Sequence, residues 1–206
     1  MTAQDTARAD DALRIGVAAD VRDSGLWHCE WDIHRWDAAA TLEATRQLDG
    51  AKPEAEHLRH LSLKPYLVSH VDGNLLTTAG LGRIATLVNA GTGNLIASTT
   101  ARIGAGDGAG TAAIGDTDLS ASAGSTHRFF QTCTVTVPSN VWTFVGTFGT
   151  ADGNFAWNEM GIDIGTATVT TGTTVNAVLL NHKTSIAQGT KASGQSWAVT
   201  ATITIS

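Results

Sequence analysis

The chain has little of the chemistry by which most enzymes are recognised from sequence. Its 206 residues include only two cysteines and three prolines. No serine lies in the Gly-x-Ser-x-Gly turn that exposes a hydrolase nucleophile, and no C-x-x-C pair points to a zinc site. Cys29 and Cys133 are too few for a secreted disulfide framework, so we expect reduced thiols made in a reducing cytoplasm. These gaps favour a protein that is not an enzyme and has no cofactor.

Long apolar runs and excess positive charge are also missing. No apolar stretch approaches the roughly 20 residues needed to span a bilayer, and the polar first residues predict no signal peptide. The formal net charge is −6, which disfavours binding to nucleic acid or to an anionic membrane surface. We therefore expect no nucleic-acid or membrane partner.

The charge that is present divides the chain in two. Residues 1–74 hold 8 of the 13 Lys and Arg residues and 13 of the 19 acidic residues, whereas the remainder holds 18 of the 22 glycines. A shift this sharp is typical of an extension joined to a compact body. The sequence therefore predicts an N-terminal arm over 1–62 and a body over 63–206.

The residue pattern of the body predicts mainly β-strands. The segment 197–205 alternates Trp197, Val199, Ala201 and Ile203 with small or threonine residues, which predicts a half-buried strand at the centre of a sheet. One helix is expected over 75–88, packed against a sheet through an apolar stripe. The predicted fold is mainly β: a β-sandwich, for which a jelly roll is one topology, with this single packed helix. Its expected strands cover residues 63–71, 101–103, 129–137, 142–148, 157–164, 175–180 and 196–205.

The arm combines helical and extended patterns. Residues 6–21 are weakly helical, and 25–36 fit a strand better than a helix. Asp37 is expected to cap a helix over 38–48 that Gly50 closes, and Pro53 to begin another over 54–61.

Three tryptophans lie within ten residues of this charged arm: Trp27, Trp31 and Trp36. A segment with this many charges cannot bury three indoles within itself. The indoles must therefore pack on the β-body or on another protein. We predict that they are interface anchors, because aromatic anchors carry much of the free energy of protein binding.

Two groups of residues are weak candidates for metal ligands, and no metal is expected at either. Asp107, Asp116 and Asp118 lie in a Gly-rich segment whose carbonyls could complete a calcium site, but the EF-hand spacing is absent. His57 and His60 would share one face of a short helix and could supply two zinc ligands.

His28, Cys29 and His34 complete the histidine-rich part of the arm. Solvated surface histidines are the simpler interpretation of all of them.

Two further motifs favour structure over catalysis. The glycines of 103–110 are not followed by a lysine or a helix, so a loop is favoured over a phosphate site. Glu159 is a single acid in an apolar strand, which predicts burial against a hydrogen-bonding partner, because glycoside hydrolysis requires a second carboxylate.

Five segments of the body carry a resemblance: residues 66–80, 101–107, 147–161, 179–183 and 189–206. Taken together, they resemble a group of virion structural proteins from tailed bacteriophages, over about residues 65–206. This resemblance implies a particle role in head decoration, a head fibre or a tail appendage, and it transfers no active site.

From the resemblance we expect a capsid decoration (cement) protein of the virion, assembled in the host cytoplasm. Its partner would be the major capsid protein or a neighbouring virion protein, and a homotrimer is expected. A tail or fibre component that contacts the host surface, and a carbohydrate-binding β-sandwich, are the alternatives.

Overall fold

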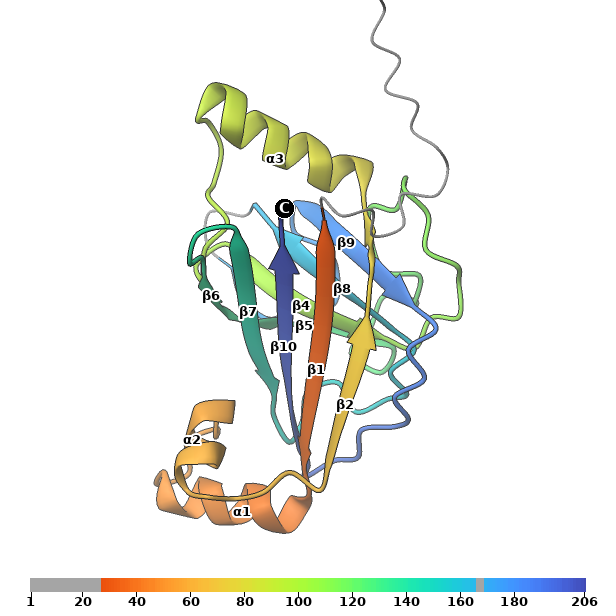
Figure 1. The fold of residues 1–206 in the computed structure, drawn as a ribbon. Coiled ribbons are helices and arrows are strands. Elements are labelled where there is room, and N and C mark those ends of the chain that lie inside the picture. Colours follow the sequence, from red (N-terminus) through yellow and green to blue (C-terminus); the bar gives the residue numbers. More distant parts are fainter. Residues whose placement is uncertain (1–26, 166–168) are drawn as a thin grey trace, which may run out of the picture.

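Two antiparallel five-stranded sheets face each other in the computed structural model, which describes residues 27–165 and 169–206 (Figure 1). Sheet A has the order β2-β1-β10-β7-β6 and sheet B the order β3-β9-β8-β4-β5. The predicted β-sandwich is confirmed. Its strands are β1 (His28–Trp36), β2 (Leu67–Asp72), β3 (Leu75–Leu76), β4 (Ala101–Gly106), β5 (Arg128–Thr132), β6 (Thr134–Thr136), β7 (Val141–Phe148), β8 (Glu159–Ile164), β9 (Val178–Thr184) and β10 (Ser196–Thr204).

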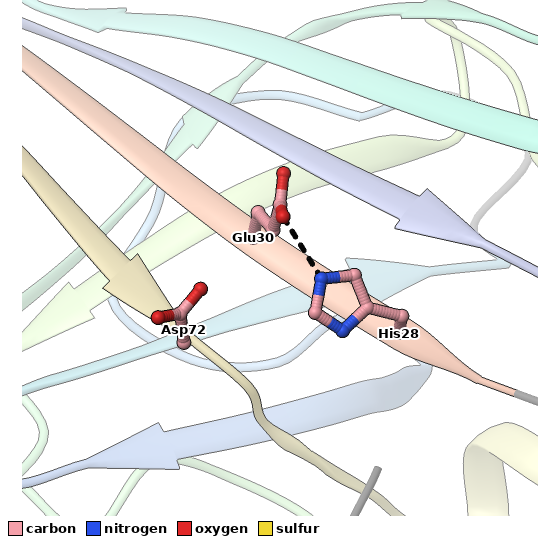
Figure 2. A group of neighbouring side chains, drawn as sticks. All are labelled: His28, Glu30 and Asp72. Atoms are coloured by element: carbon pink, nitrogen blue, oxygen red, sulfur yellow. Dashed lines mark hydrogen bonds and ion pairs between the residues drawn. The ribbon is translucent and has the colours of Figure 1, made fainter. Parts of the chain in front are cut away.

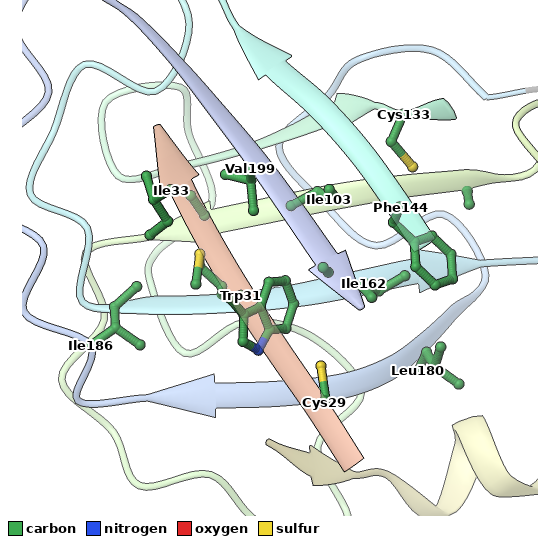
Figure 3. Close-up of a cluster of buried hydrophobic side chains, with 14 of the residues drawn as sticks. Cys29, Trp31, Ile33, Ile103, Cys133, Phe144, Ile162, Leu180, Ile186 and Val199 are labelled. Atoms are coloured by element: carbon green, nitrogen blue, oxygen red, sulfur yellow. The ribbon is translucent and has the colours of Figure 1, made fainter. Parts of the chain in front are cut away.

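Alternating side chains build the core between the sheets, as Figure 3 shows. Trp197, Val199, Ala201 and Ile203 of β10 are all buried, and β10 lies between β1 and β7. The predicted central position of this C-terminal strand is therefore confirmed.

β1 contradicts the predicted boundary between arm and body. It pairs with β10 from His28 to Trp36 and with β2 from Glu30 to Arg35, so it is an interior strand of sheet A. Its acidic residues Glu30 and Asp32 lie on the outer face and alternate with buried residues, whereas Arg35 is buried against the ring of Trp197. The high charge density of this segment therefore reflects an outer sheet face and not a separate unit. Of the predicted arm, residues 1–26 lie outside the described residues, including the helix expected over 6–21.

The three predicted interface anchors are instead buried in the chain's own cores. Trp27 and Trp31 point between the sheets, whereas Trp36 lies on the outer face of sheet A beneath the first two helices. Their exposed fractions are 9%, 0% and 0%. The sequence left two possibilities, packing on the β-body or on another protein, and these indoles pack within the chain itself. The prediction that they anchor another protein is therefore wrong.

The helices α1 (Ala38–Gln47) and α2 (Ala55–His60) connect β1 to β2. Asp37 caps α1 as predicted, since its carboxylate accepts a hydrogen bond from the Ala40 amide at 2.8 Å. Both helices cover Trp36, whose indole N–H donates to the Leu63 carbonyl at 2.7 Å.

The third helix, α3 (Thr78–Ala90), lies across the end of the sandwich opposite α1 and α2 (Figure 1). It begins three residues later than predicted, because Leu75 and Leu76 pair with β9 and Thr77 caps the helix. Gly80 allows the helix to approach β9 closely, since a Cβ there would lie 2.3 Å from the Leu180 carbonyl oxygen.

The predicted strand over 129–137 is two strands in different sheets. β5 pairs with β4 in sheet B, and β6 pairs with β7 in sheet A. The chain crosses between the sheets at Cys133, which is buried.

Candidate functional site

The predicted metal candidates do not converge. Asp107 pairs with His127 at 2.8 Å, Asp116 with His182 at 2.6 Å, and Asp118 with Arg128 at 3.0 Å. Each carboxylate therefore has a different partner. The three acids do not form a calcium site in the described part of the chain.

His57 acts as a helix-capping residue instead of a ligand. Its Nδ1 accepts a hydrogen bond from the Glu54 amide at 3.2 Å, and the Glu54 side chain completes the capping box of α2. His60 is exposed at the last turn of the same helix. Among the described residues, neither belongs to a group of three potential metal ligands.

A buried cluster surrounds Glu159, the acid that the sequence predicted to be partnered. Its Oε2 lies 2.8 Å from His182 Nε2 and accepts from the Ser120 amide, and its Oε1 accepts from the Ala121 amide at 2.7 Å. The other ring nitrogen of His182 lies 2.6 Å from Asp116 Oδ2. The prediction that Glu159 is buried against hydrogen-bonding partners is confirmed.

The two carboxylates fix the charge of the ring. Carboxylates accept only, so both nitrogens of His182 donate and the side chain is an imidazolium. Burial lowers the pKa of His182, but the hydrogen bonds to Glu159 and Asp116 together outweigh it and raise the pKa. Burial raises the pKa of Glu159, and the hydrogen bonds from His182, Ser120 and Ala121 bring it down to about 2.

This cluster holds a loop, and its carboxylate is a weak base. The hydroxyl of Ser120 donates to Glu159 at 2.5 Å, but a carboxylate with a pKa near 2 is too weak a base to activate it at neutral pH. Gly106 and Gly108 give the carboxylate room, because a Cβ at either would lie 2.5 Å from Glu159 Oε1. These two glycines therefore allow the close packing of the loop against Glu159.

A second buried ion pair holds another connection. Arg102 and Asp163 are each 1% exposed and form a salt bridge between β4 and β8. The guanidinium also donates to the carbonyls of Thr170 and Thr174, and Asp163 accepts from the Asn176 amide at 3.0 Å. The pair thus fixes the β8–β9 connection to the outer side of sheet B.

A groove of about 550 Å³ lies between α2 and the β6–β7 edge of sheet A, with Cys133 among its lining residues. Burial, with a smaller contribution from Asp163, raises the pKa of this thiol to about 12. The thiolate is the nucleophilic form of cysteine. The groove therefore offers no thiolate nucleophile at neutral pH.

Acids and imidazoles follow the outer face of β1 and β2 (Figure 2). Ligand atoms of His28, Glu30 and Asp72 all lie within 4.8 Å of one another, the only such group of three among the described residues. The sequence grouped His28 with Cys29 and His34, but strand alternation turns Cys29 into the core. The sequence did not place Asp72 in this group, because Asp72 lies on β2 and meets Glu30 only through strand pairing.

An apolar surface runs along α3. Leu81 is 53% exposed and Val88 is 83% exposed, and Ala85 is exposed between them; we call these three residues the α3 surface. The apolar stripe predicted to face a sheet is therefore turned partly to solvent. The one charged residue of the helix, Arg83, is only partly exposed, because its guanidinium packs close to Gly93 and Gly165.

No described helix is long and apolar enough to cross a bilayer. No protein-family model, curated protein or solved structure matches this chain.

Proposed function

We propose that this protein is a capsid decoration protein of a tailed bacteriophage, which attaches to the assembled head and stiffens it. The resemblance of residues 65–206 to structural proteins of tailed phages is the reason for proposing a phage particle. The observation that carries the proposal is the α3 surface.

A solvent-facing apolar stripe on a helix is costly unless another surface covers it. Apolar patches on stable domains commonly mark sites of protein interaction. α3 is fixed to the sandwich through Thr77, Gly80 and β9, so it presents Leu81 and Val88 on a rigid support. We infer that this stripe contacts the major capsid protein.

A single helix of 13 residues is about 20 Å long and buries only a modest area, so one copy would bind weakly. Weak binding by each copy is sufficient for a decoration protein, because the binding free energies of many contacts over a capsid lattice add up. Trimerisation would strengthen attachment in the same way, and we propose the trimer as the attaching species.

The test is reconstitution on purified heads that lack the protein. Leu81→Gln and Val88→Gln place a good helix former at each position and remove the apolar stripe. The matched control is Leu42→Gln on α1, where the leucine is 50% exposed at the other end of the molecule. We expect the double α3 variant to lose head binding and Leu42→Gln to keep it.

Copy number and mass separate the alternatives. Hundreds of copies per particle support the decoration role, whereas a few or tens, located on the tail, would assign the protein to the tail or a fibre. If the α3 variants bind heads normally but fail to trimerise, the surface is a contact between subunits and the proposed capsid contact is wrong.

The carbohydrate-binding alternative has less support. Sugar-binding grooves usually present exposed aromatic rings, whereas five of the six tryptophans here are at most 9% exposed.

A further inference from the structure

The outer face of β1 and β2 carries a row of five acids and imidazoles that we call the acid–imidazole strip. It consists of His28, Glu30 and Asp32 on β1 and His70 and Asp72 on β2. Glu30 lies opposite Asp72, and Asp32 lies opposite His70 in the antiparallel pair. Directly opposed residues have Cβ atoms about 5 Å apart, so paired strands hold these side chains together before any ligand arrives.

Three members of the strip have the geometry of metal ligands. His28 Nε2 lies 2.9 Å from Glu30 Oε1, and Asp72 lies beside them on the neighbouring strand (Figure 2). One nitrogen and two carboxylate oxygens lie within 4.8 Å of one another, so small side-chain rotations would bring them to the bond lengths of about 2.0–2.2 Å that zinc requires. We propose that His28, Glu30 and Asp72 bind one divalent transition-metal ion, for which Zn²⁺ is the probe.

The rest of the strip positions the ligands. One ring nitrogen of His70 lies 2.9 Å from Asp72 Oδ1, and the other lies 2.9 Å from Asp32 Oδ1. With one oxygen of Asp72 engaged by His70, the other is left for the ion. A hydrogen-bonded outer group of this kind commonly orients a ligand and tunes its affinity.

The ligand types favour a borderline metal. Calcium prefers six to eight oxygens, and magnesium keeps most of its water. An imidazole with two carboxylates suits zinc and its neighbours instead. Three protein ligands at a surface leave a coordination position for water or for a group from another molecule.

The experiment is titration of the full chain, freed of any histidine tag, with Zn²⁺ by calorimetry and with Co²⁺ by visible absorption. We expect saturation at one ion per chain and a higher Tm with zinc. His28→Ala, Glu30→Gln and Asp72→Asn should each weaken binding about tenfold or more. His70→Gln should weaken it less and leave the stoichiometry at one.

The matched control is His60→Ala, which removes an exposed histidine at the last turn of α2 and leaves the His57 cap intact. This variant should bind as the wild type does. All these side chains except Glu30 are exposed, and Glu30 is only partly buried, so circular dichroism should be unchanged. The proposal is overturned if zinc does not saturate the wild type, or if binding survives the His28, Glu30 and Asp72 changes and disappears in the control. Head attachment tests the proposed function separately, since no step of the metal argument uses the α3 surface.

Discussion

Glu159 illustrates how one side chain can hold a long loop in place. Its carboxylate receives hydrogen bonds from the imidazolium of His182 and from two consecutive backbone amides. The amides belong to Ser120 and Ala121, so the loop between β4 and β5 is tied to β8. Removing the charge should therefore loosen this loop.

The stability of the Glu159 cluster should depend on pH at both ends. The pKa of Glu159 falls from 4.5 to about 2 on folding, so its contribution is present above about pH 4.5 and is lost as the pH falls toward 2. The pKa of His182 is raised above 6.5, so its contribution is complete below pH 6.5 and is lost as the pH rises through the raised value. We expect Tm to fall on both sides of a plateau between these limits.

Glu159→Gln checks this assignment. It should cost about 3 kcal/mol near neutral pH, because it breaks a buried ion pair, and it should flatten the acid side of the profile. The control is His127→Gln, which removes an imidazole 50% exposed beside Asp107 and should change the free energy of unfolding little at neutral pH. If Tm of Glu159→Gln falls at low pH as it does in the wild type, other acidic residues are responsible for that fall.

Arg102 should be among the most sensitive single positions. Arg102→Met leaves Asp163 buried without its cation and removes the donors to Thr170 and Thr174, so we expect a loss of about 3–5 kcal/mol in the free energy of unfolding. Denaturant unfolding measures it. Restored stability in Arg102→Met/Asp163→Leu, which removes both charges, would confirm that the unpaired acid is the cause.

At the scale of elements, the strands show what a sequence pattern can and cannot predict. β10 was predictable because its alternation is a local property, and α1 because Asp37 is a local cap. The contacts of Glu159 were not, since Ser120 and His182 lie 39 and 23 residues away in sequence. The same limit applies to the metal site proposed here, where Asp72 meets His28 only through the pairing of β1 with β2.

The charged composition of β1 suggested an arm, although β1 is an interior strand of sheet A. A fragment of residues 63–206 lacks β1, so it leaves the edges of β10 and β2 unpaired and removes Cys29, Trp31 and Ile33 from the core. We expect this fragment to aggregate or stay unfolded by circular dichroism. The full chain under the same conditions is the control, and a cooperatively melting fragment would contradict the interior position of β1.

Loss of β10 should be equally severe. Deleting residues 200–206 removes most of the ladder to both β1 and β7. We expect no cooperative thermal transition in this variant. A deletion of Ser206 alone, beyond the end of β10, should melt as the full chain does.

At the scale of the whole molecule, one core joins the two sheets and includes both thiols. Cys29 is 0% exposed and Cys133 is 6% exposed. A thiol reagent can reach Cys29 only when the sandwich opens. Cys133 lines the groove beside α2, but burial raises its pKa to about 12, so it is an unreactive thiol at pH 7 while the protein stays folded. We expect labelling to follow global unfolding, with the same denaturant midpoint as circular dichroism; fast labelling of the native protein at pH 7 would contradict the buried positions.

The antiparallel pairing of β1 with β10 brings His28 beside Thr204, at the end of the sandwich that carries α3 (Figure 1). A peptide or fluorescent protein fused after Ser206 would emerge near the surface proposed to meet the head. The turn between α1 and α2 lies at the opposite end, and Gly50 there has open space around it. For displaying a cargo on a particle, the internal turn at residues 49–51 is therefore a better insertion point than the C-terminus.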